Sequence, residues 1–235
     1  MTEYNQIFGP SFLPGKAFNG PVTFFDDFLT GVTENGAKFA TTADLGEWLV
    51  TADTFTSHGA NPTVQDDADG GWVRFASDDD VGDQVTMQAN GESFLLAIGR
   101  RTVYETRLRF VSTTQDALWG ISVNTTDPLG TRPSDYIGFE LDGTADLEFT
   151  ADTGSAATAQ VDTTANVVAG TFATFSFIWD GIDTIRVYFN GAKVYQTKTT
   201  IPVGTFMSPF FTVQSAGAEP AMTIDYVLIV NDRAA

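Results

Sequence analysis

The 235-residue sequence contains no cysteine and a single histidine, His58. The absence of cysteine excludes disulfides, thiolate metal sites and cysteine nucleophiles. A lone histidine in the turn sequence Ser-His-Gly-Ala supports neither a two-histidine metal site nor a Ser-His-Asp triad. We therefore interpret His58 as a polar loop residue.

Basic residues are also few, because 12 Lys and Arg stand against 30 Asp and Glu, for a formal net charge of −18. A field of this sign repels nucleic acid and anionic membranes, so we expect neither as a partner. No apolar run approaches the ~20 residues needed to span a bilayer. The first residues, MTEYNQIFGPSF, lack the basic and apolar regions of a signal peptide, so we expect synthesis and folding in the cytosol.

Large apolar side chains alternate with small or polar ones over residues 172–197. Six of them fall on one side of two successive runs: Phe175, Phe177, Trp179, Ile185, Val187 and Phe189. Alternation with a period of two is typical of strands with one buried face. Asn190-Gly191 then precedes a third run and is a strong hairpin signal, because a type I′ turn requires positive φ at both central residues. The stretch predicts a three-stranded antiparallel meander with an aromatic inner face.

Short strand patterns recur along the chain, and residues 24–235 contain no amphipathic helix and no linker. Further strands are predicted at residues 24–28, 72–75, 84–88, 94–98, 103–110, 119–123, 136–141, 146–150, near 167, 209–214 and 222–230. One helical turn is predicted over residues 41–49. One face of the last strand is predicted to carry Met222, Ile224, Tyr226, Leu228 and Val230. About a dozen strands without crossover helices predict an all-β fold, an antiparallel two-sheet jelly-roll sandwich in one domain, residues 24–235.

Residues 1–23 differ from the rest, because Gly-Pro and Pro-Gly pairs interrupt them every few positions and exclude a regular helix or a long strand. The segment is nevertheless apolar at Ile7, Phe8, Phe12, Leu13 and Phe18. An apolar segment that cannot fold alone needs a partner surface. We interpret residues 1–23 as an extended N-terminal arm, packed either on its own domain or on a neighbouring subunit.

Several sheet motifs together resemble a known family. The motifs are Phe25-Asp26-Asp27-Phe28, residues 103–108 (VYETRL), 117–121 (ALWGI), 137–139 (IGF), 185–191 (IRVYFNG) and 223–227 (TIDYV). They resemble the concanavalin A-like, laminin-G-type jelly-roll domains in structural proteins of tailed bacteriophages, most of all capsid decoration proteins. The resemblance covers residues 24–230.

The resemblance implies a non-enzymatic virion structural protein that decorates or cements the capsid by binding the major capsid protein or another virion protein. It implies a place on the outer capsid surface after synthesis in the bacterial host cytoplasm, and it allows a homo-oligomer. The five apolar residues of the arm are the candidate partner-binding residues. An alternative function is a carbohydrate-binding module on a phage tail or head surface, with a glycan as ligand.

The same jelly roll hosts glycoside hydrolases, in which two carboxyl groups flank the scissile bond. Glu140-x-Asp142 and Asp146-x-Glu148 could each place two acids on one strand face. The related hydrolases carry a third acid two or three positions beyond the Asp, where this chain has Thr144 and Ala145. Asp142-Gly143 is also typical of a turn. We therefore predict no catalytic residues, and a glycoside hydrolase is the least supported function.

Acidic loops invite a calcium interpretation, because hard cations take several carboxylate oxygens. Asp66, Asp67 and Asp69 are the candidate ligands, but their spacing does not match an EF-hand, so we expect no cofactor and keep calcium as an alternative. The four tryptophans, Trp48, Trp72, Trp119 and Trp179, could form a sugar-stacking platform. Because three of the four fall on strand patterns, core packing is favoured.

Overall fold

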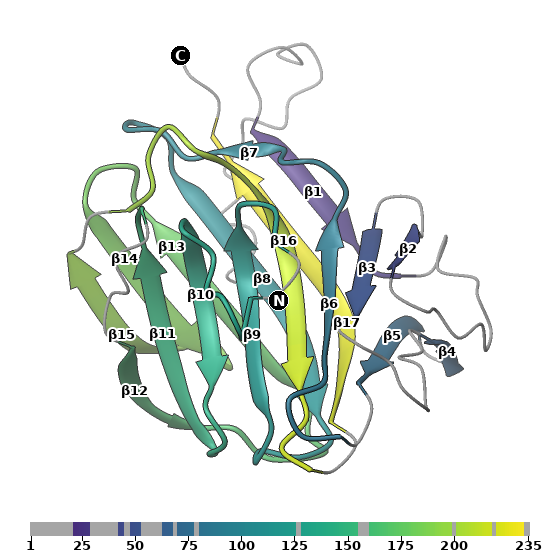
Figure 1. The fold of residues 1–235 in the computed structure, drawn as a ribbon. Helices are drawn as coiled ribbons and strands as arrows, with labels where there is room; N and C mark the ends of the chain where they lie inside the picture. Colours follow the sequence, from purple (N-terminus) through teal and green to yellow (C-terminus); the bar gives the residue numbers. More distant parts are fainter. Residues whose placement is uncertain are drawn as a thin grey trace.

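A computed structural model describes residues 21–28, 42–44, 48–52, 63–67, 70–77, 80–125, 128–154, 160–198, 201–217 and 220–232. The candidate partner-binding residues of the arm, together with His58 and Asp69, lie outside these ranges. Figure 1 shows strands in two facing layers. The residues that the structure describes contain no helix that could cross a membrane.

The first layer, sheet A, is an eight-stranded antiparallel sheet in the order β15-β14-β13-β8-β17-β5-β4, with β1 paired to β17. Its strands are β1 (Val22–Asp26), β4 (Thr63–Asp67), β5 (Gly70–Ala76), β8 (Thr102–Phe110), β13 (Ala173–Trp179), β14 (Thr184–Phe189), β15 (Ala192–Lys198) and β17 (Ala221–Asn231). The central β8 and β17 come from distant parts of the sequence, so the sheet brings both halves of the chain together.

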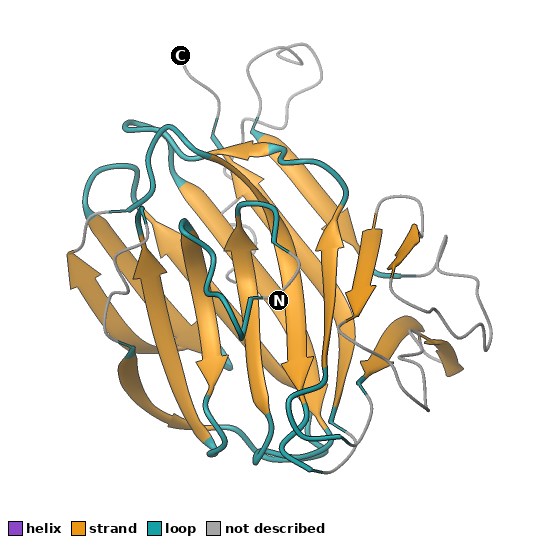
Figure 2. Ribbon diagram, viewed as in Figure 1, coloured by secondary structure: helices purple, strands orange, loops and turns teal. Residues whose placement is uncertain are grey.

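The second layer, sheet B, is a nine-stranded antiparallel sheet in the order β12-β11-β10-β9-β16-β6-β3-β2, with β7 paired to β16. Its strands are β2 (Thr42–Asp44), β3 (Trp48–Ala52), β6 (Gln84–Ala89), β7 (Phe94–Leu95), β9 (Asp116–Ser122), β10 (Tyr136–Leu141), β11 (Asp146–Asp152), β12 (Val161–Asn166) and β16 (Phe206–Gln214). Figure 2 shows the two layers joined only by loops in the described part of the chain, which confirms the predicted all-β sandwich.

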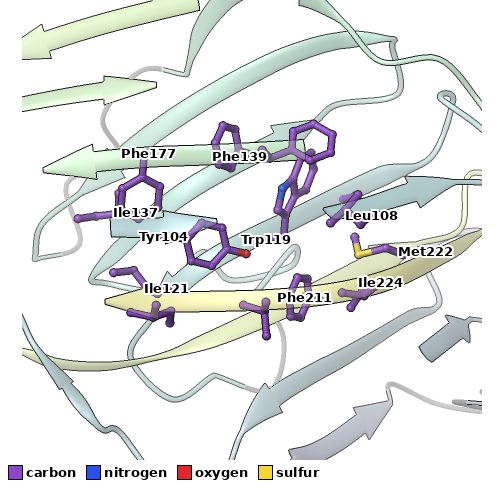
Figure 3. Packing of buried hydrophobic residues seen from close by; sticks show 14 of the residues in the cluster. Tyr104, Leu108, Trp119, Ile121, Ile137, Phe139, Phe177, Phe211, Met222 and Ile224 are labelled. Atoms are coloured by element: carbon purple, nitrogen blue, oxygen red, sulfur yellow. The ribbon is translucent and has the colours of Figure 1, made fainter. Parts of the chain in front are cut away.

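Aromatic rings fill the space between the sheets. Trp119 lies 5.0 Å from Phe175 and 5.7 Å from Phe139, centroid to centroid, and Tyr104 stacks on Phe177 at 5.2 Å. Figure 3 shows Trp119 and Phe139 of sheet B facing Tyr104 and Phe177 of sheet A. The predicted meander is confirmed as β13, β14 and β15, and its aromatic inner face belongs to this core.

Core packing of the tryptophans is confirmed for three of the four. Trp48, Trp119 and Trp179 are buried, and the indole of Trp48 donates a hydrogen bond to Asp26 Oδ2 at 2.7 Å. Trp72 is different, because its strand neighbour Val73 points into the core and places Trp72 on the outer face of sheet A.

Two local predictions are wrong. Of the expected helical turn over residues 41–49, the described residues 42–44 and 48–49 belong to β2 and β3, and Trp48 and Val50 are both buried, as extended alternation requires. On β17, Ile224 pairs with Leu108 and Tyr226 with Arg107, so Asp225 is an extra residue in a β-bulge. The bulge reverses the alternation, and the core side chains are Met222, Ile224, Val227 and Ile229.

Smaller differences concern strand lengths. The strand expected at 94–98 ends at Leu95, and the strand expected near Val167 is β12, which ends at Asn166. β2, β3 and β4 were not expected from the sequence. β1 begins at Val22, two residues before the expected start of the globular part.

Candidate functional site

The outer face of sheet B holds a buried apolar patch above bare backbone. Gly120 on β9 pairs with Gly138 on β10, and a Cβ at either position would lie 2.2 Å from a carbonyl oxygen of the neighbouring strand. Around the two glycines, Leu118, Tyr136 and Phe210 form a second buried cluster, separate from the main core. The glycines therefore allow strands β9 and β10 to approach each other beneath this patch.

A loop between β9 and β10 covers the patch, and we call its described residues, 123–125 and 128–135, the covering loop. Its base is closed by the Val123 amide, which donates to Asp135 O at 3.1 Å. Two glutamine side chains of β6 hold it from below. Gln88 Oε1 accepts the Thr125 amide at 3.0 Å, and Gln84 Oε1 accepts the Leu129 amide at 3.4 Å. Figure 2 shows the loop crossing in front of the sheet.

Arg132 of the covering loop reaches the acids of β10 and β11. Its Nη2 lies 2.6 Å from Oε1 and 2.7 Å from Oε2 of Glu140, and its Nη1 lies 3.8 Å from Asp152 Oδ2. Glu140 is also the direct cross-strand partner of Glu148, which in turn faces Asp162 on β12. Arg132 thus lies beside Glu140 and Asp152, and Glu148 and Asp162 continue a row of acids from Glu140 across β11 and β12.

Burial raises the pKa of Glu140 to about 7, while the Arg132 guanidinium acts in the opposite direction. Burial also raises the pKa of Glu148, and the neighbouring charges of Asp142 and Asp162 add to this rise. The protein therefore holds protons on this face more tightly than isolated carboxyl groups would. A raised carboxyl pKa is a property of some catalytic acids, but it also follows from burial alone.

The two carboxylate pairs considered from the sequence do not form the two-acid arrangement of a glycoside hydrolase. Glu140 is the penultimate residue of β10, whereas Asp142 lies beyond the strand in an exposed turn. Asp146 is exposed at the start of β11. The direct cross-strand neighbour of Glu148 is Glu140. The acid that the structure buries, Glu140, is bound by Arg132 on both oxygens, so its arrangement is that of a structural ion pair.

The candidate calcium ligands are only partly placed. Asp66 and Asp67 end strand β4, and their backbones pair with Gly71 and Gly70. Within the described part of the chain, no group of three or more acidic, histidine or cysteine side chains is arranged to hold a metal ion. The calcium alternative therefore remains a prediction.

Four exposed apolar side chains belong to, or directly follow, the β7–β8, β13–β14 and β15–β16 connections, and these connections lie at the upper end of the sandwich in Figure 1. They are Ile98, Ile182, Val203 and Phe206, which we call the apolar rim. Ile98 and Ile182 are 66% and 69% exposed, and their loops are joined by the Gly99 amide, which donates to Gly181 O at 2.7 Å. The loop with Val203 is joined to β7 by the Gly204 amide, which donates to Leu96 O at 2.8 Å.

The turn that carries Ile182 has a fixed geometry. Asp180 Oδ1 accepts the amides of Ile182, Asp183 and Thr184 at 2.9, 3.1 and 3.1 Å. Gly181 has a φ of +82°, and a Cβ there would lie within 2.9 Å of the Arg100 backbone, so only glycine allows the two loops to meet. β1 enters at this same end, because Val22 pairs with Asn231 and the Asn231 side chain donates to Leu95 O at 3.2 Å. The N-terminal arm therefore joins the domain beside the apolar rim.

Arg132 and the apolar rim were not identified from the sequence. A single arginine in a turn-rich loop carries no motif, and its role depends on the pairing of β10 with β11. The rim has a weak signal, because each of Ile98, Ile182 and Val203 adjoins a glycine in a turn. Val81 adjoins Gly82 in the same way at the opposite end of the sandwich, so the signal does not select one end.

Residues 110–223 match a family described as the concanavalin A-like lectin/glucanases superfamily, Laminin_G_3. No curated protein matches the sequence significantly. The matched stretch contains β9 to β16, and with them Glu140, Glu148 and the covering loop. Together with the two antiparallel sheets, the match establishes a concanavalin A-like jelly-roll fold.

Solved structures with the same fold include an endo-1,3-β-glucanase from Streptomyces sioyaensis, at 15% identity and a TM-score of 0.58 over 94% of this chain and 99% of that one. The seed lectin of Lotus tetragonolobus matches at 12% identity and a TM-score of 0.58 over 91% of this chain and 100% of the lectin. The potassium-bound carbohydrate recognition domain of Emp46p matches at 12% identity and a TM-score of 0.54, over 86% of this chain and 94% of that domain. At these identities the likeness concerns the fold.

Proposed function

We propose that this protein is a non-enzymatic structural protein of a phage virion that decorates the outer capsid surface by binding the major capsid protein. The observation that carries the proposal is the apolar rim, which lies at the end of the sandwich where the N-terminal arm enters. Exposed apolar side chains gathered on rigid loops are typical of protein–protein interfaces. The rim and the arm, with Phe8, Phe12 and Phe18, would form one continuous docking end.

Two further features support a binding role over catalysis. The buried acid of sheet B, Glu140, is paired on both oxygens with Arg132, and the covering loop lies on the patch beside it. The net charge of −18 suits a surface that faces away from packaged DNA. Binding to the assembled lattice and not to free subunits would stabilise the capsid by mass action.

The test is co-sedimentation of the protein with capsid shells assembled from the major capsid protein of the same phage. Deletion of residues 2–20, and separately Ile98→Glu combined with Ile182→Glu, should each abolish co-sedimentation. The matched control combines Val81→Glu with Val168→Glu at the opposite end, where both side chains are equally exposed, and it should bind like the wild type. Circular dichroism should show that all variants keep the sandwich.

Unchanged capsid binding by both the deletion and the rim variant would contradict the proposal. Loss of binding in the control variant as well would show that added negative charge, and not the rim, is responsible.

Carbohydrate binding is the second candidate function. Two of the solved structures with this fold are named a seed lectin and a carbohydrate recognition domain, and a third is named a glucanase. The candidate predicts that purified protein binds at least one saccharide on a glycan array, with and without calcium. An array without any positive saccharide would contradict it.

A further inference from the structure

The outer face of sheet A concentrates positive charge on a strongly acidic protein. Four arginines point outward from β5, β8 and β14: Arg74, Arg107, Arg109 and Arg186. The described side chains that face the same way include two acids, Glu105 and Asp225. The outer face of sheet B has the opposite balance, with Arg132 beside a row of acids that starts at Glu140.

Arg109 is held in place by two aromatic rings. Its Cζ lies 4.4 Å from the ring centroid of Trp72 and 4.8 Å from that of Phe172, and the two rings meet edge to face at 5.4 Å. Each cation–π contact contributes of the order of 0.5–1 kcal/mol at a partly exposed site. The three groups come from β5, from β8 and from the residue just before β13, so the sheet itself sets their arrangement.

Arg107 and Arg109 share the Phe172 ring, but only Arg107 is paired with a carboxylate of the described residues. Arg107 also lies over Phe172, at 4.7 Å from the centroid, and its guanidinium is paired with the carboxylate of Asp225 in the bulge of β17. Among the described residues, the Arg109 guanidinium has no carboxylate and no hydrogen-bond acceptor. A planar guanidinium offers five donors in a fixed fork that matches a carboxylate. Arg109 is therefore an ordered cationic group that no carboxylate of the described residues neutralises.

Exposed aromatic surface lies on the same face. Phe25 on the edge strand β1 is 57% exposed and lies 6.1 Å from Tyr226, centroid to centroid. Tyr226 is in turn the cross-strand partner of Arg107, and two strand spacings, about 10 Å, separate the β1 and β8 backbones. Phe25 is level with Glu105, so Arg109 lies four residues, roughly 13 Å, further along β8. Flat aromatic rings beside cationic groups can take an apolar ring face and an anion at the same time.

We propose that the outer face of sheet A binds an acidic saccharide chain, with Arg109 taking a sugar carboxylate and Phe25 stacking against a sugar ring several units further along the same chain. This site lies on the sheet opposite to the covered face of sheet B. The inference rests on the second candidate function, carbohydrate binding, and gives it a place and a ligand class. An acidic peptide could pair with Arg109 equally well, but the exposed ring of Phe25 favours a ligand that also has apolar ring faces.

The test measures binding of the full chain to two uronic-acid polymers, polygalacturonate and hyaluronan, by affinity electrophoresis. Neutral dextran and poly-glutamate are run beside them. The wild type should bind a uronate polymer, with an affinity that falls as salt is added. It should bind poly-glutamate at least about tenfold more weakly, because that chain lacks the sugar ring for Phe25.

Arg109→Ala and Phe25→Ala should each weaken uronate binding about tenfold, the factor that corresponds to one lost charge-assisted or stacking contact. Arg109→Lys should bind uronate almost as weakly as Arg109→Ala, since an ammonium cannot form the bidentate fork. The matched control is Arg186→Ala, which removes the same charge from the same face but no aromatic contact, and it should change binding by no more than about twofold. A thermal melt of each variant checks folding.

Equal losses in Arg109→Ala and Arg186→Ala would overturn the site, because they would indicate diffuse attraction to a basic face. Equal binding of poly-glutamate would overturn the saccharide as ligand. Failure to bind either uronate polymer would also overturn the inference. Carbohydrate binding itself would survive if neutral saccharides bind and Arg109→Ala leaves that binding intact, so the two hypotheses fail separately.

Discussion

The two outer faces of the sandwich treat their charged groups in opposite ways. On sheet B, the covering loop places Arg132 on Glu140 and near Asp152, and the glutamines of β6 use their side-chain oxygens to hold that loop. On sheet A, Arg109 is fixed by Trp72 and Phe172 but has no acceptor among the described residues. The Arg132 charge on sheet B is paired within the fold, whereas on sheet A Arg107 is paired with Asp225 and Arg109 is ordered by aromatic rings instead of by a carboxylate of the described residues.

The difference shows how a jelly-roll sandwich can leave one sheet exposed for binding and cover the other. A loop that covers one sheet converts polar groups from ligand contacts into internal hydrogen bonds, which stabilise only as long as every partner stays in place. Sheet A can expose side chains of neighbouring strands side by side, one strand spacing apart. We therefore expect mutations on sheet B to change stability and mutations on sheet A to change binding.

The largest effect is expected at the glycine pair beneath the sheet B patch. A Cβ at Gly138 would lie 2.2 Å from Trp119 O and 2.9 Å from Gly120 Cα, both backbone atoms that cannot move away without separating β9 from β10. Gly138→Ala should lower the free energy of unfolding by about 4 kcal/mol or more. Urea denaturation measures this loss.

The control is Gly99→Ala. The space around Gly99 is open and only its φ of +83° opposes a side chain, so we expect a cost of about 1 kcal/mol. Similar losses at the two positions would show that β9 and β10 do not approach as closely as described.

The next effect is expected from Arg132→Ala, which would leave Glu140 buried without its cation. Breaking a buried pair by removing one partner costs about 3 kcal/mol. The loss should be larger at pH 8, where Glu140 is ionised, than at pH 5, where it is protonated. Arg101→Ala, which breaks an exposed pair with Asp232 at 3.7 Å, is the control and should cost at most about 0.5 kcal/mol. Equal losses for the two arginines would contradict a structural role for Arg132.

The wild-type protein should lose stability as the pH rises from about 4.5 to about 7. Burial raises the pKa of Glu140 from 4.5 to about 7, so the folded state binds more protons than the unfolded state within this window. A shift of this size corresponds to roughly 3 kcal/mol, which partial solvent exposure reduces to on the order of 2 kcal/mol.

The raised pKa values of Glu148 and Asp116 act in the same direction. Glu140→Gln should flatten most of the dependence in urea titrations at pH 5, 6, 7 and 8. A pH profile that is unchanged by this substitution would assign the dependence to other groups.

The sequence predicted the scaffold well and the two faces poorly, for a physical reason. Period-two alternation and Asn190-Gly191 are local, so the β13–β15 meander and the two-sheet fold could be predicted from neighbours in the chain. The bulge at Asp225 could not, because it depends on the register between β17 and β8. The helical turn at 41–49 was wrong for a similar reason, since pairing with β6 fixes β3 as extended.

The candidate site shows the same limit. Glu140 and Glu148 were identified as candidate acids from their spacing, but their cross-strand pairing and the ion pair with Arg132 require the β10–β11 register. The Arg109 cluster joins residues 72, 109 and 172, which no local pattern connects. Both faces are products of register, and register is set by the whole sheet.

The smallest expected effect on stability tests sheet A. Arg109→Ala removes two cation–π contacts at a partly exposed position and no ion pair, so it should lower the free energy of unfolding by only about 1 kcal/mol. Arg132→Ala should cost more in stability, while Arg109→Ala should weaken uronate binding more. A urea titration and affinity electrophoresis on the same two variants measure both quantities. If Arg109→Ala destabilises the protein as much as Arg132→Ala does, then Arg109 is part of the fold, and the contrast between a closed face and an open face is wrong.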